Sequence, residues 1–199
     1  MHAWVIRHPD GAILVDTGVG LGNGLIDEWY NPQAILLSAS LGTAGLAPSD
    51  IAAVVVSHLH FDHCGQQATL SAPTYVQPVE LEEAQAPGYT VPEWAAIPKN
   101  RLRIVHGDQN MAEGIRLLAT PGHTPGHQSV VIEAGDKRVV IAAQCAYRTE
   151  ELRSGHPAAS NLHDDTWLDA SHDSLQRLRS LAPFTAHLSH DPEIVTIVR

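Results

Sequence analysis

Three histidines and one aspartate stand close together in residues 58–63, His-Leu-His-Phe-Asp-His. They follow a β-branched run at 51–57 that is typical of a strand buried on both faces. If the strand geometry continues, His58, His60 and Asp62 project from one side and the last histidine from the other. Imidazole and carboxylate are suitable ligands for Zn²⁺ and related divalent ions. The run therefore predicts two imidazoles for one metal ion and a carboxylate–imidazole pair for a second.

Two later motifs place further imidazoles at strand ends. The segment Thr120-Pro-Gly-His-Thr-Pro-Gly-His127 uses proline and glycine to form a tight loop that can hold His123 rigidly. His190 follows an apolar run at 186–189. Of the 13 histidines in the chain, the others outside these motifs are interpreted as solvated or structural. His127 either supports a metal ligand or is a simple loop residue, and the latter interpretation is favoured.

The elements that must position these residues alternate along the chain. Strands are predicted at 3–7 and 12–15, joined as a hairpin, and at 51–57, 74–76, 102–105, 115–119, 128–133, 139–143 and 186–189. Helices are predicted at 32–41, 79–86 and 166–181. The Pro-rich loop that reaches to about residue 100 is either lid-like or an ordinary surface connection. The mixture predicts a layered α/β or α+β architecture, with one domain over residues 1–199.

The composition of the chain limits the kinds of partner that it is expected to bind. With 22 acidic against 12 basic residues, the formal charge of −10 disfavours nucleic acid as a partner and favours a small-molecule substrate. No apolar stretch is long enough to cross a membrane, and no basic segment with a long apolar core begins the sequence. The two cysteines, Cys64 and Cys145, are too few for a disulfide framework. We therefore expect a soluble, cytoplasmic protein that binds neither nucleic acid nor a membrane.

The motifs, taken in order, resemble those of the metallo-β-lactamase superfamily. The ligand series of residues 58–63, His123 and His190 is similar to that of the superfamily, and so is the upstream motif Val15-Asp-Thr-Gly18. Tyr147 and the stretches 48–51 and 78–81 resemble the N-acyl homoserine lactonase-like branch. The likeness covers about residues 4–192. It implies an α+β fold, an αββα sandwich of two mixed β-sheets flanked by helices, with a metal site at one edge.

The resemblance also implies a role for each motif residue. The first metal ion would be held by His58, His60 and His123, and the second by Asp62, His63 and His190. Asp62 would in addition orient the attacking water. Asp16 would orient a ligand imidazole through its other ring nitrogen, or alternatively cap a turn. Tyr147 would hydrogen-bond the substrate, or alternatively be a half-buried core tyrosine.

One position departs from the family pattern. Dinuclear members carry a bridging aspartate at the end of the strand equivalent to 139–143, where this chain has Gln144. A neutral amide oxygen coordinates weakly and supplies no negative charge, so the second ion should bind less tightly. A one-residue shift would place Cys145 there instead, as a thiolate ligand; strand alternation favours Gln144.

The chemistry that these residues imply is metal-assisted hydrolysis, in which the metal makes water acidic enough to attack a carbonyl. We expect one or two Zn²⁺ ions, with other divalent ions as alternatives, and a lactone or ester-like substrate. Two alternatives remain. In the first, the chain keeps its metal and has lost efficient turnover because of Gln144. In the second, it acts on thioesters or phosphodiesters, as other members of the superfamily do.

Overall fold

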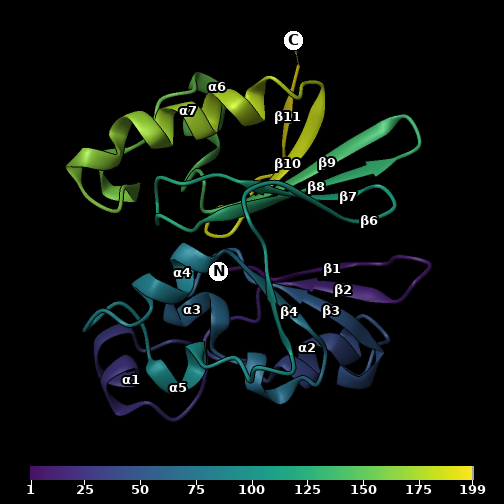
Figure 1. Cartoon of the computed structure of the whole chain (residues 1–199), viewed down its shortest axis with the longest axis vertical. Coiled ribbons are helices and arrows are strands. Elements are labelled where there is room, and N and C mark those ends of the chain that lie inside the picture. Colours follow the sequence, from purple (N-terminus) through teal and green to yellow (C-terminus); the bar gives the residue numbers. More distant parts are fainter. Residues whose placement is uncertain (199) are drawn as a thin grey trace. The chain divides into compact units, whose positions relative to one another are not determined.

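The computed structural model of the chain describes residues 1–198, which fall into two units (Figure 1). The first unit contains Met1 and residues 3–76 and 84–104, and the second contains His2, residues 77–83 and the chain from Val105 onward. Each unit is built on one β-sheet. That the two units form a single domain stays a prediction.

The first unit has a five-stranded mixed sheet in the order β1-β2-β3-β4-β5. Its strands are β1 (Trp4–Ile6), β2 (Ala12–Val15), β3 (Ile51–Val55), β4 (Thr74–Val76) and β5 (Leu102–Ile104). β1 and β2 form the predicted antiparallel hairpin, and β2 to β5 run parallel. Val15, Val54 and Val55 are fully buried, because a parallel strand at the centre of a sheet is covered on both faces.

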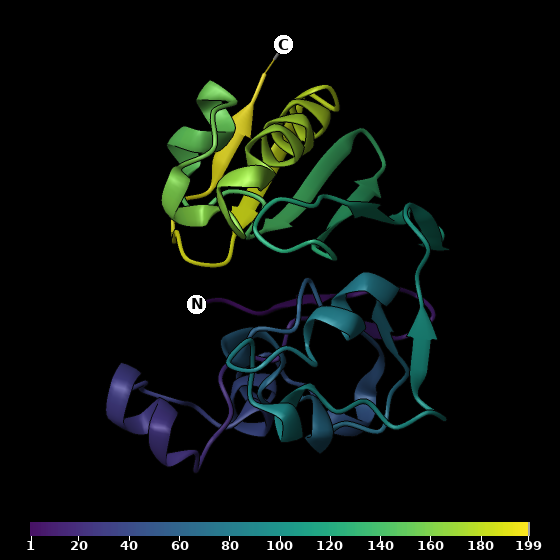
Figure 2. The same ribbon diagram turned by 60° about the vertical axis from the view of Figure 1, so that its left-hand side comes forward.

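The helices of this unit differ from the sequence prediction. They are α1 (Gly24–Tyr30), α2 (Leu37–Thr43), α3 (Phe61–Cys64) and α5 (Pro92–Ala95), with short 3₁₀ turns at Pro48–Asp50 and Gln67–Thr69. The single helix predicted at 32–41 is wrong in its bounds. Asn23 caps α1 by accepting from two backbone N–H groups, and Asn31 ends it in the left-handed conformation. α1 projects at the margin of its unit, in purple in Figure 2.

The second unit has a six-stranded mixed sheet in the order β11-β10-β9-β8-β7-β6. Its strands are β6 (Gln109–Ala112), β7 (Ile115–Ala119), β8 (Gln128–Ala134), β9 (Lys137–Ala143), β10 (Phe184–Leu188) and β11 (Val195–Ile197). Only β9 and β10 pair in parallel; the other neighbours are antiparallel. The sequence analysis missed β6 and β11, because β6 carries an exposed polar pair and β11 is three residues long.

Two helices cover one face of this second sheet (Figure 1). The unit contains α4 (Pro78–Glu83), α6 (Thr149–Ser154) and α7 (Leu168–Arg179), with 3₁₀ turns η3 (Ala159–Asn161) and η4 (Asp165–Trp167). Leu175 and Leu178 of α7 pack with Leu152 of α6 on Val131 and Val140 of the sheet. The helix predicted at 166–181 thus packs on the sheet through its central leucines. Leu168, the first residue of α7, is 48% exposed and lies outside the core.

Strand direction brings the motifs to one edge of each sheet. Val15 and Val55, the last residues of β2 and β3, are register partners, so the segments that follow them start side by side. In the second sheet the last residue of β9 pairs with the last residue of β10, Ala143 with Leu188. β8 runs antiparallel to β9, so the loop that precedes β8 lies at this same edge. Among residues 1–198, no helix is long and apolar enough to span a membrane.

Candidate metal centre

Asp16, at the end of β2, organises the metal-ligating segment of the first unit. Its carboxylate is fully buried and accepts hydrogen bonds from the Ser57 backbone N–H (2.7 Å) and the Ser57 hydroxyl (2.8 Å). The His63 Nδ1 atom lies 2.8 Å from the second carboxylate oxygen. Asp16 has φ +60°, which places it in the left-handed region. The expected contact to a ligand imidazole is therefore present, and Asp16 does more than cap a turn.

The run at 58–63 does not continue the strand, so the condition for strand alternation among its side chains is not met. β3 ends at Val55, and α3 begins at Phe61 with His60 as its extended N-cap residue. Asp62 and His63 therefore lie on the first turn of a helix, where side chains are not related by strand alternation. The expected carboxylate–imidazole pair still forms. The Asp62 Oδ2 atom and the His63 Nε2 atom are 3.6 Å apart.

The donor atoms of this segment fit a zinc ion. A contact at Nδ1 fixes the imidazole tautomer and directs Nε2 to a metal. The His63 Nδ1 atom meets Asp16, and the His58 Nδ1 atom lies 3.0 Å from the Ser57 hydroxyl oxygen. Two ligand atoms on one tetrahedral zinc ion lie about 3.4 Å apart, given zinc–ligand bonds of about 2.1 Å. The separation of 3.6 Å between Asp62 and His63 matches such a pair.

In the second unit, the loop 120–127 holds His123. Glycines in this loop allow two close approaches of the backbone. A Cβ atom on Gly122 would lie 2.6 Å from Ser171 of α7, and one on Gly126 would lie 2.5 Å from the backbone of Glu80 in α4. The loop is thus clamped between two helices. The Nδ1 atom of His123 lies 3.1 Å from the backbone carbonyl oxygen of Asn161.

His190 and Gln144 meet at the carboxyl ends of β10 and β9. The Nε2 atom of His190 lies 3.1 Å from the Oε1 atom of Gln144. When Nε2 carries the proton it donates to the amide oxygen, and in the other tautomer both atoms present lone pairs to a common ion. The Tyr147 ring stacks on His190 with ring centroids 4.9 Å apart and planes 7° apart. At 39% exposure, Tyr147 is not a core residue.

His127 is a positioning residue, contrary to its interpretation as a simple loop residue. It is fully buried, and its Nε2 atom accepts a hydrogen bond of 3.1 Å from the Gln144 backbone N–H. Its Nδ1 atom lies 3.1 Å from the Thr120 carbonyl oxygen. These two contacts specify the neutral tautomer protonated at Nδ1. His127 thereby fixes the backbone of Gln144, next to Ala143 at φ +50°.

The thiol alternative receives no support from the structure. Cys145 belongs to the apolar core of the second unit. Burial raises the pKa of its thiol to about 12, and burial likewise raises the pKa of Cys64 to about 12. With Cys145 in the core, Gln144 is the side chain that meets His190.

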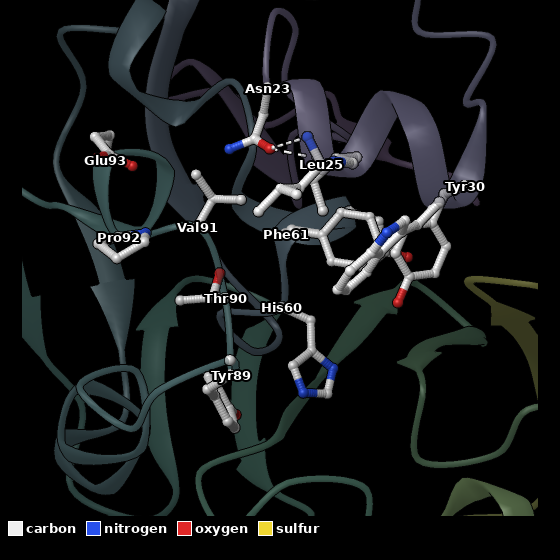
Figure 3. Close-up of a pocket in the computed structure, with 14 residues that line it drawn as sticks. Asn23, Leu25, Tyr30, His60, Phe61, Tyr89, Thr90, Val91, Pro92 and Glu93 are labelled. Atoms are coloured by element: carbon white, nitrogen blue, oxygen red, sulfur yellow. Dashed lines mark hydrogen bonds between the residues drawn. The ribbon is translucent and has the colours of Figure 1, made fainter.

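A pocket of about 520 Å³ lies in the first unit (Figure 3). His60 and Asp62 line it together with Phe61. α1 supplies apolar walls through Leu25, Ile26, Trp29 and Tyr30, and the segment 88–93 lines it as well. Tyr30 packs against Phe61 and Tyr89 against His60, each with ring centroids 4.7 Å apart. The pocket thus places apolar surface beside two of the candidate metal ligands.

Sequence reasoning missed three residues that hold these ligands. The sequence could have indicated a role for Ser57, because this residue directly precedes the histidine run. It gave a weaker indication for His127, as the last residue of its Pro-Gly loop. Asn161 carried none, since only the folded chain brings its 3₁₀ turn to His123 and Gln144. The structure groups the predicted ligands within each unit; that the two groups form one centre stays a prediction.

Comparison with known proteins identifies similar hydrolases. A family model for the metallo-beta-lactamase superfamily matches residues 2–190. An N-acyl homoserine lactonase from a Bacillus species is 34% identical over an alignment 170 residues long, which covers 78% of this chain and 68% of that protein. A solved N-acyl homoserine lactone hydrolase, with the product N-hexanoyl-L-homoserine at its catalytic metal centre, is 27% identical with a TM-score of 0.79, covering 97% of this chain and 86% of that chain.

A more distant structure extends the likeness in fold. AidC, a dizinc quorum-quenching lactonase, is 20% identical, has a TM-score of 0.74, and is matched over 96% of this chain and 73% of its own. Together with the two mixed sheets and their helices, these matches confirm the predicted fold class.

The contacts of Asp16 generate a test. We expect Asp16→Asn to weaken zinc binding about 10- to 100-fold, because the amide removes the charge that orients the His63 ring. Competition with a chelator measures the zinc dissociation constant. Asp10→Asn is the matched control, because the Asp10 side chain is 86% exposed in the β1–β2 turn. An unchanged dissociation constant in Asp16→Asn, with the protein folded, would contradict the role assigned to this carboxylate.

Proposed function

Because the chain belongs to the metallo-β-lactamase superfamily, we propose that this metal-dependent hydrolase opens the ring of a lactone that carries an aliphatic acyl tail. The observation that carries the proposal is the pocket lined by both His60 and Asp62 and by the apolar face of α1. Its volume of about 520 Å³ suits a small-molecule ligand. A lactone beside the metal ligands and a tail along α1 would use both parts of this surface.

The metal centre that we propose draws ligands from both units. His58, His60 and His123 would hold the first ion, and Asp62, His63 and His190 the second. Zinc is the preferred ion, because the donors are imidazoles with one carboxylate. Gln144 stands beside His190 without a charge, so the second ion should be the weaker one. The Nδ1 contacts of His58, His63 and His123 support this assignment, since each directs Nε2 to a metal.

The residues divide the reaction among them. Bound zinc supplies a Lewis acid that polarises the lactone carbonyl and makes water acidic enough to attack near neutral pH. The Asp62 carboxylate would accept a hydrogen bond from the attacking water and orient it toward the carbonyl carbon. The Tyr147 hydroxyl would donate a hydrogen bond to the substrate oxygen. The ester C–O bond then breaks, the ring oxygen takes a proton, and the product is a hydroxy acid.

Substrate charge favours this reading over the phosphodiester alternative. Asp62 and Glu93 both line the pocket, and among residues 1–198 no lysine or arginine does. A phosphodiester would therefore meet no cationic side chain there to pair with its phosphate, whereas a neutral lactone needs none. A cytoplasmic location also stays a proposal, supported by two buried free thiols.

Turnover of lactones tests the proposal directly. We expect zinc-loaded protein to hydrolyse N-hexanoyl-homoserine lactone, and His123→Ala to lower kcat/KM at least roughly 100-fold by removing a metal ligand. Lactone opening releases acid and is measured by a pH indicator. His106→Ala is the control, because this histidine is exposed in the same unit. Tight zinc without turnover of lactones, thioesters or phosphodiesters would favour the metal-binding homologue instead.

The pocket that we propose for the acyl tail leads to a separate prediction. Leu25 lines the pocket and is 59% exposed, so Leu25→Asp should leave the fold intact. We expect the KM for the hexanoyl substrate to rise about tenfold, ~1.4 kcal/mol, because the carboxylate replaces apolar contact worth ~0.8 kcal/mol per methylene. The KM for the corresponding acetyl substrate should be the same as in the wild type. Leu21→Asp, 49% exposed and outside the pocket, is the matched control. Equal effects on both substrates would rule out a tail site along α1.

The neutral side chain of Gln144 leads to a prediction about the number of zinc ions that the protein binds. We expect wild-type protein to hold one zinc ion tightly, and Gln144→Asp to bind a second more tightly, because the carboxylate adds negative charge next to His190. Zinc content after dialysis against a dilute chelator measures this difference. Gln109→Asp adds the same charge at an exposed position on β6 and should have no effect. Full occupancy of two sites in the wild type, unchanged in Gln144→Asp, would show the charge argument to be wrong.

A further inference from the structure

A short segment of the second unit contacts both the loop 120–127, which contains His123, and Gln144 at the end of β9. This segment, residues 158–163, contains η3 and is tied down at three points. The Ala158 N–H donates to the Glu151 side chain at 2.9 Å. The Asn161 side chain donates to the Gln144 carbonyl at 3.1 Å, and the His163 N–H donates to the Gly122 carbonyl at 2.8 Å. The segment therefore connects the end of β9 to the loop 120–127.

Asn161 contacts both neighbours through different groups. Its backbone carbonyl oxygen lies 3.1 Å from the Nδ1 atom of His123. This carbonyl is the last of η3, and the last carbonyls of a helical turn have no partner within the turn. A carbonyl oxygen only accepts, so the contact requires a proton on Nδ1 and leaves the lone pair on Nε2. The position of this carbonyl thus selects the ring nitrogen that His123 can present to a metal ion.

The side chain of Asn161 keeps that carbonyl in place. The Nδ2 atom must face Gln144, because the Gln144 carbonyl can accept a hydrogen bond but cannot donate one. Asn161 is fully buried, and within residues 1–198 its Oδ1 atom has no hydrogen-bond partner. An unmatched buried acceptor opposes folding. An apolar side chain at this position would avoid that cost. The favourable contribution of the Asn161 amide is therefore the hydrogen bond from Nδ2 to the Gln144 carbonyl at the end of β9.

We propose that Asn161 is a positioning residue of the metal centre, which sets the tautomer of His123 and couples it to the backbone of Gln144. This inference rests on the proposed function, because it takes His123 as a metal ligand. Asn161 acts through its neighbours and does not touch substrate. Its loss should therefore change the metal site more than the binding of the acyl tail.

Two variants and one control test this role. Asn161→Ala removes the side-chain bond, and Asn161→Asp keeps the size of the side chain while placing an acceptor against the Gln144 carbonyl. Ser160→Ala is the control, because Ser160 is exposed in the same turn. The zinc dissociation constant is measured by chelator competition. The visible absorption of the Co²⁺-loaded protein reports ligand geometry, and thermal unfolding of the metal-free protein reports the fold.

We expect both Asn161 variants to raise the zinc dissociation constant roughly tenfold, to alter the Co²⁺ spectrum, and to lower kcat with little change in KM. Ser160→Ala should match the wild type. If Asn161→Ala fails to fold, the same measurements on Asn161→Asp test the proposal. Variants with the wild-type zinc affinity and Co²⁺ spectrum, or a Ser160→Ala protein equally weakened, would overturn the role of Asn161. A wild-type protein that binds no zinc would instead overturn the proposed function, and this role with it.

Discussion

The buried carboxylate of Asp16 is the interaction on which the ligand segment of the first unit depends. A carboxylate removed from water is costly unless hydrogen bonds compensate its charge, and here the compensating groups are Ser57 and His63. One side chain thereby joins the end of β2 to the end of β3 and to α3. The left-handed backbone at Asp16 is a strained conformation, which persists when surrounding bonds determine it.

The corresponding edge of the second unit is held by neutral groups. His127 accepts from the backbone of Gln144, the Gln144 amide meets His190, and the Asn161 carbonyl meets His123. These contacts also orient imidazoles, but they add no negative charge. Two divalent cations close together repel each other, and only an anion between them offsets that repulsion. The neutral Gln144, where a carboxylate would bridge two ions, is the physical basis for proposing one tight and one weak ion.

The pocket of the first unit relates this chemistry to a substrate. Its two charged lining residues, Asp62 and Glu93, are acidic, and its remaining wall is largely aromatic and aliphatic. Such a surface favours a neutral molecule with one reactive carbonyl and an apolar tail. α1 supplies much of that wall while burying only Ile26 among its own side chains. The proposed selection of the acyl tail would therefore depend on a helix that contributes little to the core, and it could vary without loss of the fold.

The sequence alone determined the ligand types, their order and the fold class. The histidine run, the Pro-Gly loop and His190 are local patterns, and the resemblance they carry is confirmed by the family match over residues 2–190. Most strand positions were also predictable, because buried β-branched runs such as β3 and β9 have a strong local signal. Short or polar elements such as β6, β11 and α1 have none.

Tertiary structure decided which groups orient the ligands. The turn into α3 after His60 ended the strand alternation that the spacing suggested. The contacts of His127 and Asn161 join segments far apart in the sequence, and Tyr147 meets His190 across 43 positions. Hydrogen bonds act over about 3 Å in space, whatever the separation along the chain. The residue types in a motif therefore state which chemistry is available, while the strand register and loop packing determine which nitrogen of each imidazole is presented.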